Sequence, residues 1–139
     1  AKNLIVWDKG DGGIGGMYQH CYELVWFFAN NRAQDSTLRR TDGARAVNGV
    51  PNIWRFPRVP SKQREHNAAK PVEMIKIPVK ASSDKNDVVL DLFTGSGSTL
   101  VACEELNRTF YGMEIEPSWC DVIIKRWENL TGKKAEKSK

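Results

Sequence analysis

Runs of apolar residues divide the chain into short segments of regular structure joined by polar loops. Compact apolar runs predict β-strands at 3–7, 24–28, 53–56, 88–90 and 109–113. The runs at 24–28 and 88–90 contain no polar residue, so both strands are expected to be buried, the second on both faces. Five glycines between residues 8 and 16 predict a flexible loop after the first strand.

Apolar residues at helical spacing predict three helices. One begins after Pro71, and Pro78 is expected to end or kink it early. A second begins at Ser98 and Thr99, whose hydroxyls can cap it. The third has an apolar stripe made of Cys120, Ile123, Ile124, Trp127 and Leu130. Its other face, with Lys125, Arg126 and Glu128, is expected to meet water, and Gly132 is expected to form its left-handed end.

Candidate chemistry lies where the apolar run 88–90 ends at Asp91. A turn of small residues follows, with Gly95 and Gly97, then a predicted helix, and then a strand that ends at Glu114. Glycines let the backbone turn sharply and let a ligand approach closely. The free N–H groups of the following helix would face that ligand. This order of features is typical of a nucleoside cofactor site in an α/β fold.

The spacing of residues narrows the choice of cofactor. A dinucleotide-binding turn would have a third glycine at position 100, which is Leu100, and a phosphate loop would have lysine before Ser98. Glu114 can hold two ribose hydroxyls, as acidic residues at such strand ends do. Asp91 can accept a hydrogen bond from an ammonium group. A ligand with both groups is S-adenosylmethionine.

Residues 91–99, Asp-Leu-Phe-Thr-Gly-Ser-Gly-Ser-Thr, and 111–117, Tyr-Gly-Met-Glu-Ile-Glu-Pro, resemble the cofactor-binding part of the amino-group DNA methyltransferases. These enzymes methylate N6 of adenine or N4 of cytosine. Residues 66–75, with Lys70-Pro71, are similar to the segment that precedes the glycine turn in the circularly permuted beta arrangement of the family.

The resemblance implies part of a Rossmann-like, S-adenosylmethionine-dependent methyltransferase fold, with a mostly parallel sheet and flanking helices. It assigns residues 1–30 to the sheet after the catalytic motif, 31–66 to target recognition and 67–132 to cofactor binding; residues 133–139 are expected to be a disordered tail. The expected cofactor-binding residues are Lys70, Asp91, Phe93, Gly95, Ser96, Gly97, Ser98 and Glu114. Lys70 would pair with the cofactor carboxylate, although Lys70-Pro71 could also simply begin a packed helix.

The family's catalytic tetrapeptide, Asp/Asn/Ser-Pro-Pro-aromatic, is absent from the chain. In the beta order this motif precedes every segment recognised here, so we expect the C-terminal part of a longer enzyme, inactive alone. No catalytic residue is therefore assigned. The expected reaction is methylation of adenine N6 in DNA, with cytosine N4 as the alternative. A methyltransferase acting on RNA or a small molecule, and a non-catalytic binding module, remain open.

Positive charge is concentrated between residues 31 and 66. This window carries a net charge of +5, whereas the whole chain carries +4. Arginine suits bidentate contacts to phosphates and guanine edges, so a basic loop beside a cofactor site predicts recognition of double-stranded DNA; a solvated surface loop is the alternative. The expected DNA-binding residues are Arg39, Arg40, Arg45, Arg55, Arg58, Lys62 and Arg64. Trp54 and Phe56 either pack inward or stack on a base.

Composition adds a few further expectations. Cys21, Cys103 and Cys120 form no Cys-x-x-Cys pair, which favours a reducing compartment over a disulfide framework or a zinc site. His20 and Glu23 lie three apart but have no neighbouring ligands, so no metal site is expected. No apolar run approaches the length of a membrane span. We expect a cytoplasmic, nucleoid-associated protein of bacterial or phage origin, with homodimerisation open because sheet edges may lack cover.

Overall fold

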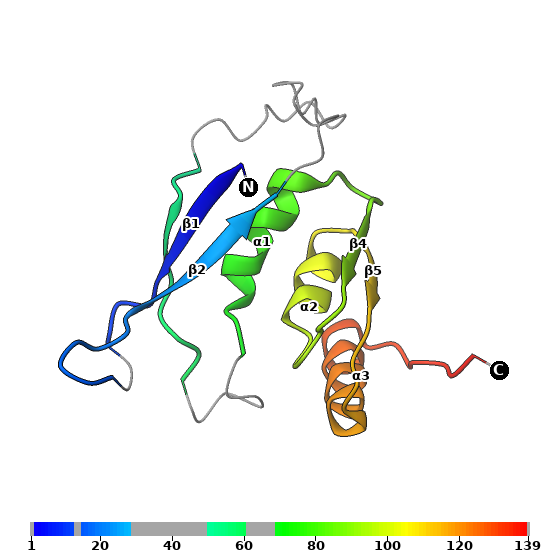
Figure 1. Cartoon of the computed structure of the whole chain (residues 1–139). Helices are drawn as coiled ribbons and strands as arrows, with labels where there is room; N and C mark the ends of the chain where they lie inside the picture. The colour runs from blue at the N-terminus through cyan, green and yellow to red at the C-terminus, as the bar shows by residue number, and fades with distance from the viewer. Residues whose placement is uncertain (1, 13–14, 29–49, 61–68, 139) are drawn as a thin grey trace. The chain divides into compact units, whose positions relative to one another are not determined.

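The computed structural model describes residues 2–12, 15–28, 50–60 and 69–138 of the chain. These residues belong to two compact units, 1–58 and 59–139 (Figure 1). Strands β1, β2 and β3 lie in the first unit. The second unit has the order α1, β4, α2, β5 and α3.

The first unit is a three-stranded sheet of order β2-β1-β3. Strand β1 (Asn3–Asp8) pairs antiparallel with β2 (Tyr22–Phe27) and parallel with β3 (Ile53–Arg55). Trp7 and Trp54 face each other across β1 and β3, and both are buried. The indole N–H of Trp7 donates to the Phe56 carbonyl at 2.8 Å. Of the two alternatives for Trp54, the structure shows inward packing.

The expectation that residues 24–28 form a buried strand is wrong for the part of the chain that the structure describes. Strand β2 begins earlier, at Tyr22, and Leu24 and Trp26 are about half exposed, at 49% and 56%. Burial in a strand depends on what covers each face, and a continuous apolar run does not encode this cover. The sequence therefore identified the strand but not its environment.

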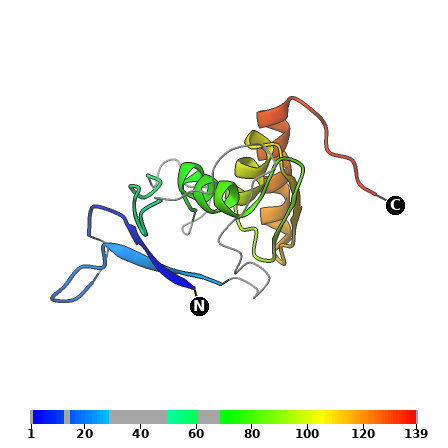
Figure 2. The same ribbon diagram turned by 90° about the horizontal axis from the view of Figure 1, so that it is seen from above.

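The second unit is built on two parallel strands, β4 (Val88–Asp91) and β5 (Thr109–Gly112). Helices α1 (Val72–Ser82) and α2 (Ser98–Glu105) pack together, and α2 also packs against β5 and α3 (Pro117–Thr131). Figures 1 and 2 show the helices of this unit on one face of the β4–β5 pair. The buried apolar side chains of this unit are Met74, Val79, Val101, Ala102 and Cys103.

Strand β4 is not buried on both faces among the described residues, contrary to the sequence prediction. Val88 and Leu90 are 62% and 61% exposed, and Tyr111, opposite Leu90 on β5, is 59% exposed. These side chains point to the face of the pair that the helices do not cover. Val89 and Phe110 alternate with them and are half-buried.

Three predictions about the helices need correction. Pro78 lies inside α1 and does not end it, because the helix continues to Ser82. Gly97, in the left-handed conformation, is the N-cap of α2; Ser98 is the first helical residue, and its hydroxyl donates to the Lys70 carbonyl at 2.9 Å. Helix α3 buries no residue completely. Its predicted C-cap, Gly132, is confirmed by a φ of 71°.

The chain after α3 is exposed and has no helix or strand through residue 138. The Ala135 N–H donates to a Glu128 carboxylate oxygen at 3.0 Å. This contact and Lys134 lower the pKa of Glu128. The disorder expected for residues 133–139 stays a prediction.

Gly112 ends β5 where the strand passes the turn after β4. A Cβ built on Gly112 would lie 2.6 Å from the Phe110 ring and 2.6 Å from the Thr94 hydroxyl oxygen. Thr94 is buried, so it has little freedom to move away. Only glycine fits this position without a shift of its neighbours.

Gly112→Ala is expected to reduce the free energy of unfolding by about 1–3 kcal/mol, because the added methyl group overpacks this contact. Urea unfolding followed by circular dichroism measures the change. Gly16→Ala is the matched control, since a Cβ there meets no atom within 4 Å. Equal stability of both variants would contradict the close packing described.

Candidate functional site

The candidate site lies at the carboxyl ends of β4 and β5. Because the strands are parallel and adjacent, they bring Asp91 and Glu114 to the same edge of the pair. The turn between β4 and α2 fills the space between these two acids. Its glycines adopt the predicted left-handed conformation, with φ of 55° at Gly95 and 80° at Gly97. The sequence expectation for the backbone of this turn is therefore confirmed.

Thr94 ties the turn to the end of β5. Its N–H and its hydroxyl both donate to the Met113 carbonyl, at 3.1 and 3.0 Å. The Met113 N–H in turn donates to the Asp91 carbonyl at 2.9 Å. The sequence analysis did not select Thr94, because a hydroxyl in a turn gives no sign of a partner 19 residues away.

Glu114 holds the turn from the other side. One carboxylate oxygen accepts the Gly95 N–H at 2.7 Å, and the other accepts the Glu116 N–H at 3.1 Å. A carboxylate has about four acceptor positions, so two backbone hydrogen bonds orient it without exhausting its capacity. Glu114 therefore shapes the glycine turn and also presents acceptor oxygens at the edge of the strands.

Asp91 is oriented in a similar way. Its Oδ1 accepts the Phe93 N–H at 3.0 Å, which turns the carboxylate toward the start of the glycine turn. The Phe93 side chain is 90% exposed, and Ile115, just after Glu114, is 97% exposed. Two exposed apolar side chains beside two oriented carboxylates suit a ligand that has both an apolar ring and hydrogen-bonding groups.

A cavity of about 240 Å³ adjoins the turn. Five of the eight predicted cofactor-binding residues line it, namely Lys70, Asp91, Phe93, Gly95 and Ser96, together with Ser98 as a sixth. Gly97 and Glu114 are not among the residues that line it. Ala69, Ile75, Thr94 and Thr99 complete the lining, and none of these was selected from the sequence.

Of the predicted DNA-binding residues, the structure describes two. Arg55 is exposed and lies 3.5 Å from Asp8, and Arg58 donates to the His20 carbonyl at 2.9 Å. Both have partners within the first unit. The other predicted residues, Arg39, Arg40, Arg45, Lys62 and Arg64, lie outside the described residues, and their role stays a prediction.

Arg126 departs from the expectation that its face of α3 meets water. Its side chain is half-buried, and its Nη1 donates to the Ser96 carbonyl in the glycine turn at 2.9 Å. Helical periodicity placed Arg126 opposite the apolar stripe, and a long side chain can still reach a neighbouring segment from there. The turn is therefore held by Glu114, Met113 and Arg126 together.

Other sequence candidates have plain structural roles. Glu23 pairs with the buried Lys9 at 2.6 Å. Burial raises the pKa of the Cys103 thiol, which disfavours the reactive thiolate. Within the described ranges, no group of three or more potential metal ligands occurs, and no helix is long and apolar enough to cross a membrane.

Glu114→Ala is expected to raise the hydrogen-exchange rate of the Gly95 amide at least about tenfold, because the amide loses a charged acceptor. Residue-resolved exchange by NMR measures this rate. Glu136→Ala, which removes a carboxylate from the exposed C-terminal segment, should leave it unchanged. If Gly95 exchanged equally fast in both variants, the Glu114 contact would not hold the turn.

The chain was compared with known proteins. It is 28% identical to the type II methyltransferase M2.MboI of Moraxella bovis over 137 residues, which are 93% of this chain and 50% of that protein. It is 33% identical to the DNA adenine methyltransferase YhdJ of Escherichia coli, over 97% of this chain and 55% of the relative. The chain thus spans about half the length of these curated relatives.

Solved structures agree on the fold. A DNA modification methylase from Thermus thermophilus, complexed with S-adenosyl-L-methionine, matches with a TM-score of 0.62 and 24% identity, over 94% of this chain and 54% of that one. The predicted α/β methyltransferase fold is confirmed. A family model described as DNA methylase, for N6 and N4 methyltransferases, matches residues 1–126. Since this match covers most of the chain, the chain belongs to the N6/N4 DNA methylase family.

Proposed function

We propose that this chain is the cofactor-binding and target-recognition part of an S-adenosylmethionine-dependent DNA methyltransferase. The observation that carries the proposal is the pair of oriented carboxylates, Asp91 and Glu114, on either side of a left-handed glycine turn. Membership of the N6/N4 DNA methylase family supports the reaction class. Because the chain spans about half the length of its relatives, the activity belongs to the proposal.

The residues at the site fit this cofactor. Glu114 would accept hydrogen bonds from the ribose hydroxyls, since its carboxylate is already oriented by two backbone N–H groups. Asp91 would accept from the ammonium group, and Lys70, which lines the same cavity, would face the carboxylate. The exposed Phe93 ring would cover an apolar part of the ligand. The bound cofactor supplies a methyl group activated by the sulfonium.

The protein's own contribution to the reaction is positioning. A donor that is held at several points lets an acceptor amine approach the methyl group in line, and such preorganisation removes much of the entropic barrier. The acceptor would be an exocyclic amine of a base flipped out of the duplex. We propose N6 of adenine, because the Escherichia coli relative named above is a DNA adenine methyltransferase. N4 of cytosine is the second candidate.

DNA would be held by the basic window of residues 31–66. Its net charge of +5 suits contacts to backbone phosphates. Arg55 and Arg58 have partners within the first unit, so we assign base and phosphate contacts first to Arg39, Arg40 and Arg45. The chain lacks the tetrapeptide that binds the target amine, so we propose that it binds donor and DNA without transferring the methyl group.

Isothermal titration with S-adenosylmethionine tests the cofactor assignment. Glu114→Gln keeps an acceptor for the Gly95 N–H but loses the charge, so we expect affinity about tenfold weaker than that of the unmodified chain. Glu136→Gln, a matched charge loss in the C-terminal segment, should bind as the unmodified chain does. Unchanged affinity of Glu114→Gln would contradict the ribose role of Glu114.

Incubation with duplex DNA and methyl-labelled S-adenosylmethionine tests the proposed inactivity. No labelled methyl group is expected in the DNA, because this chain lacks the residues that position the acceptor amine. Label in the DNA would show that the chain is a complete catalyst. Mass spectrometry of the digested DNA would then distinguish N6-methyladenine from N4-methylcytosine.

A further inference from the structure

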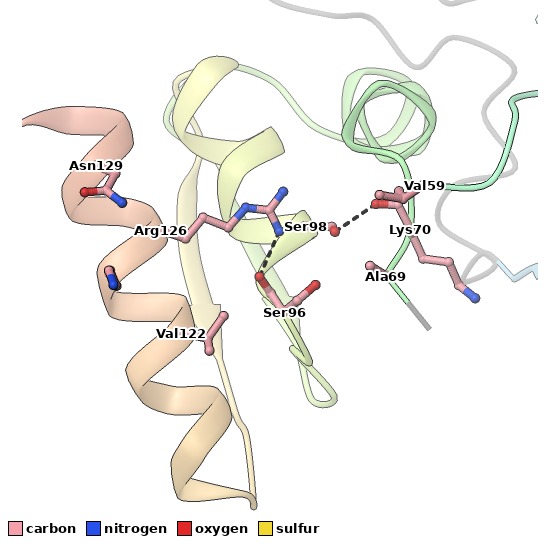
Figure 3. Close-up of a pocket in the computed structure, with 9 residues that line it drawn as sticks. Val59, Ala69, Lys70, Ser96, Ser98, Val122, Arg126 and Asn129 are labelled. Carbon is pink, nitrogen blue, oxygen red and sulfur yellow. Dashed lines mark hydrogen bonds between the residues drawn. The ribbon is translucent and has the colours of Figure 1, made fainter. Parts of the chain in front are cut away.

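A second crevice lies on the helical side of the glycine turn, between α3 and the segment that leads into α1 (Figure 3). Its volume is about 390 Å³. The first turn of α2, with Ser98, forms one wall, and helix α3 forms the opposite wall. The crevice shares Ala69, Lys70, Ser96 and Ser98 with the cofactor cavity, but Asp91 and Phe93 are not part of it.

The described residues that line this crevice carry positive charge only. Lys70, Lys125 and Arg126 contribute to it, and none of its lining residues is acidic. The free N–H groups at the start of α2 add a partial positive charge, since this helix has no side-chain cap and no acidic residue in its first turn. This combination favours an anion.

Two polar groups show that the crevice is suited to hold a ligand. The guanidinium of Arg126 lies in the space between α3 and the turn, and its Nη1 is fixed by the Ser96 carbonyl (Figure 3). A fixed guanidinium can still donate through its other N–H groups. Ser96 is only 5% exposed, and its hydroxyl has no hydrogen-bond partner among the described residues. A buried hydroxyl without a partner in the wall of a basic crevice indicates a missing acceptor.

We propose that this crevice binds a phosphate group of a nucleic-acid backbone. Arg126 would form charge-assisted hydrogen bonds with the phosphate oxygens, the Ser96 hydroxyl would donate to one of them, and Lys125 would add charge at the rim. The shape and charge of the crevice select the phosphate, while the choice of nucleic acid as its source rests on the proposed function. The contact would hold the second unit on DNA independently of base sequence.

Titration of the ¹⁵N-labelled chain with inorganic phosphate, at constant ionic strength, tests the anion site. Amide shifts are expected at Ser98 and Thr99. The double variant K125Q/R126Q should bind phosphate at least about tenfold more weakly, because charge-assisted hydrogen bonds are lost. K80Q/K85Q removes the same charge from exposed positions outside the crevice and should bind as the unmodified chain does. Lys125→Gln alone, which leaves the Arg126 contact with the turn intact, should show a smaller loss in the same direction.

Binding of a short DNA duplex at several salt concentrations tests the source of the phosphate. The log–log salt dependence should be smaller by about 0.9 in K125Q/R126Q than in the control, as expected for one lost phosphate contact. Equal slopes would overturn the nucleic-acid source. Equal phosphate affinity in K125Q/R126Q and the control would overturn the site itself.

A separate titration with S-adenosylmethionine distinguishes this proposal from the proposed function. A chain that binds the cofactor but not phosphate would refute the crevice alone. Competition between phosphate and the cofactor would place the anion in the cofactor cavity and also overturn the crevice. A chain that binds phosphate but not the cofactor would support the crevice and refute the cofactor assignment.

Discussion

The hydrogen bond from the Gly95 N–H to the Glu114 carboxylate is the contact on which the site depends. It joins the turn after β4 to the end of β5, and the two hydrogen bonds from Thr94 to the Met113 carbonyl reinforce the same connection. A turn with two left-handed glycines has many alternative conformations. Contacts to a neighbouring strand select one of them, and they orient the acidic group that we assign to the ribose.

The sequence predicted the chemistry of this site better than its surroundings. Asp91 and Glu114 could be paired in advance, because adjacent parallel strands end at one edge of a sheet. Local backbone demands were also readable, as the left-handed turn and the Gly132 cap show. Both features depend on residues close together in sequence or on a simple rule of strand order.

Features that depend on distant cover or on long side chains were not predictable in the same way. Val88 and Leu90 are apolar enough for a buried strand, yet helices cover only one face of the pair in the described structure. Ser98 has the side chain of a cap but donates to Lys70, because Gly97 already provides the conformation that starts α2. Arg126 was assigned to water by periodicity alone, whereas its length lets it reach the Ser96 carbonyl.

The most direct test of the central claim is an NMR titration of the labelled chain with S-adenosylmethionine, in which each backbone amide is followed separately. The account predicts the largest shifts at Phe93, Gly95 and Ile115, because these amides or side chains lie between the two oriented carboxylates. It also predicts slower exchange of the Gly95 amide when the ligand is bound. Shifts confined to residues outside the ends of β4 and β5, or no shifts at all, would contradict it.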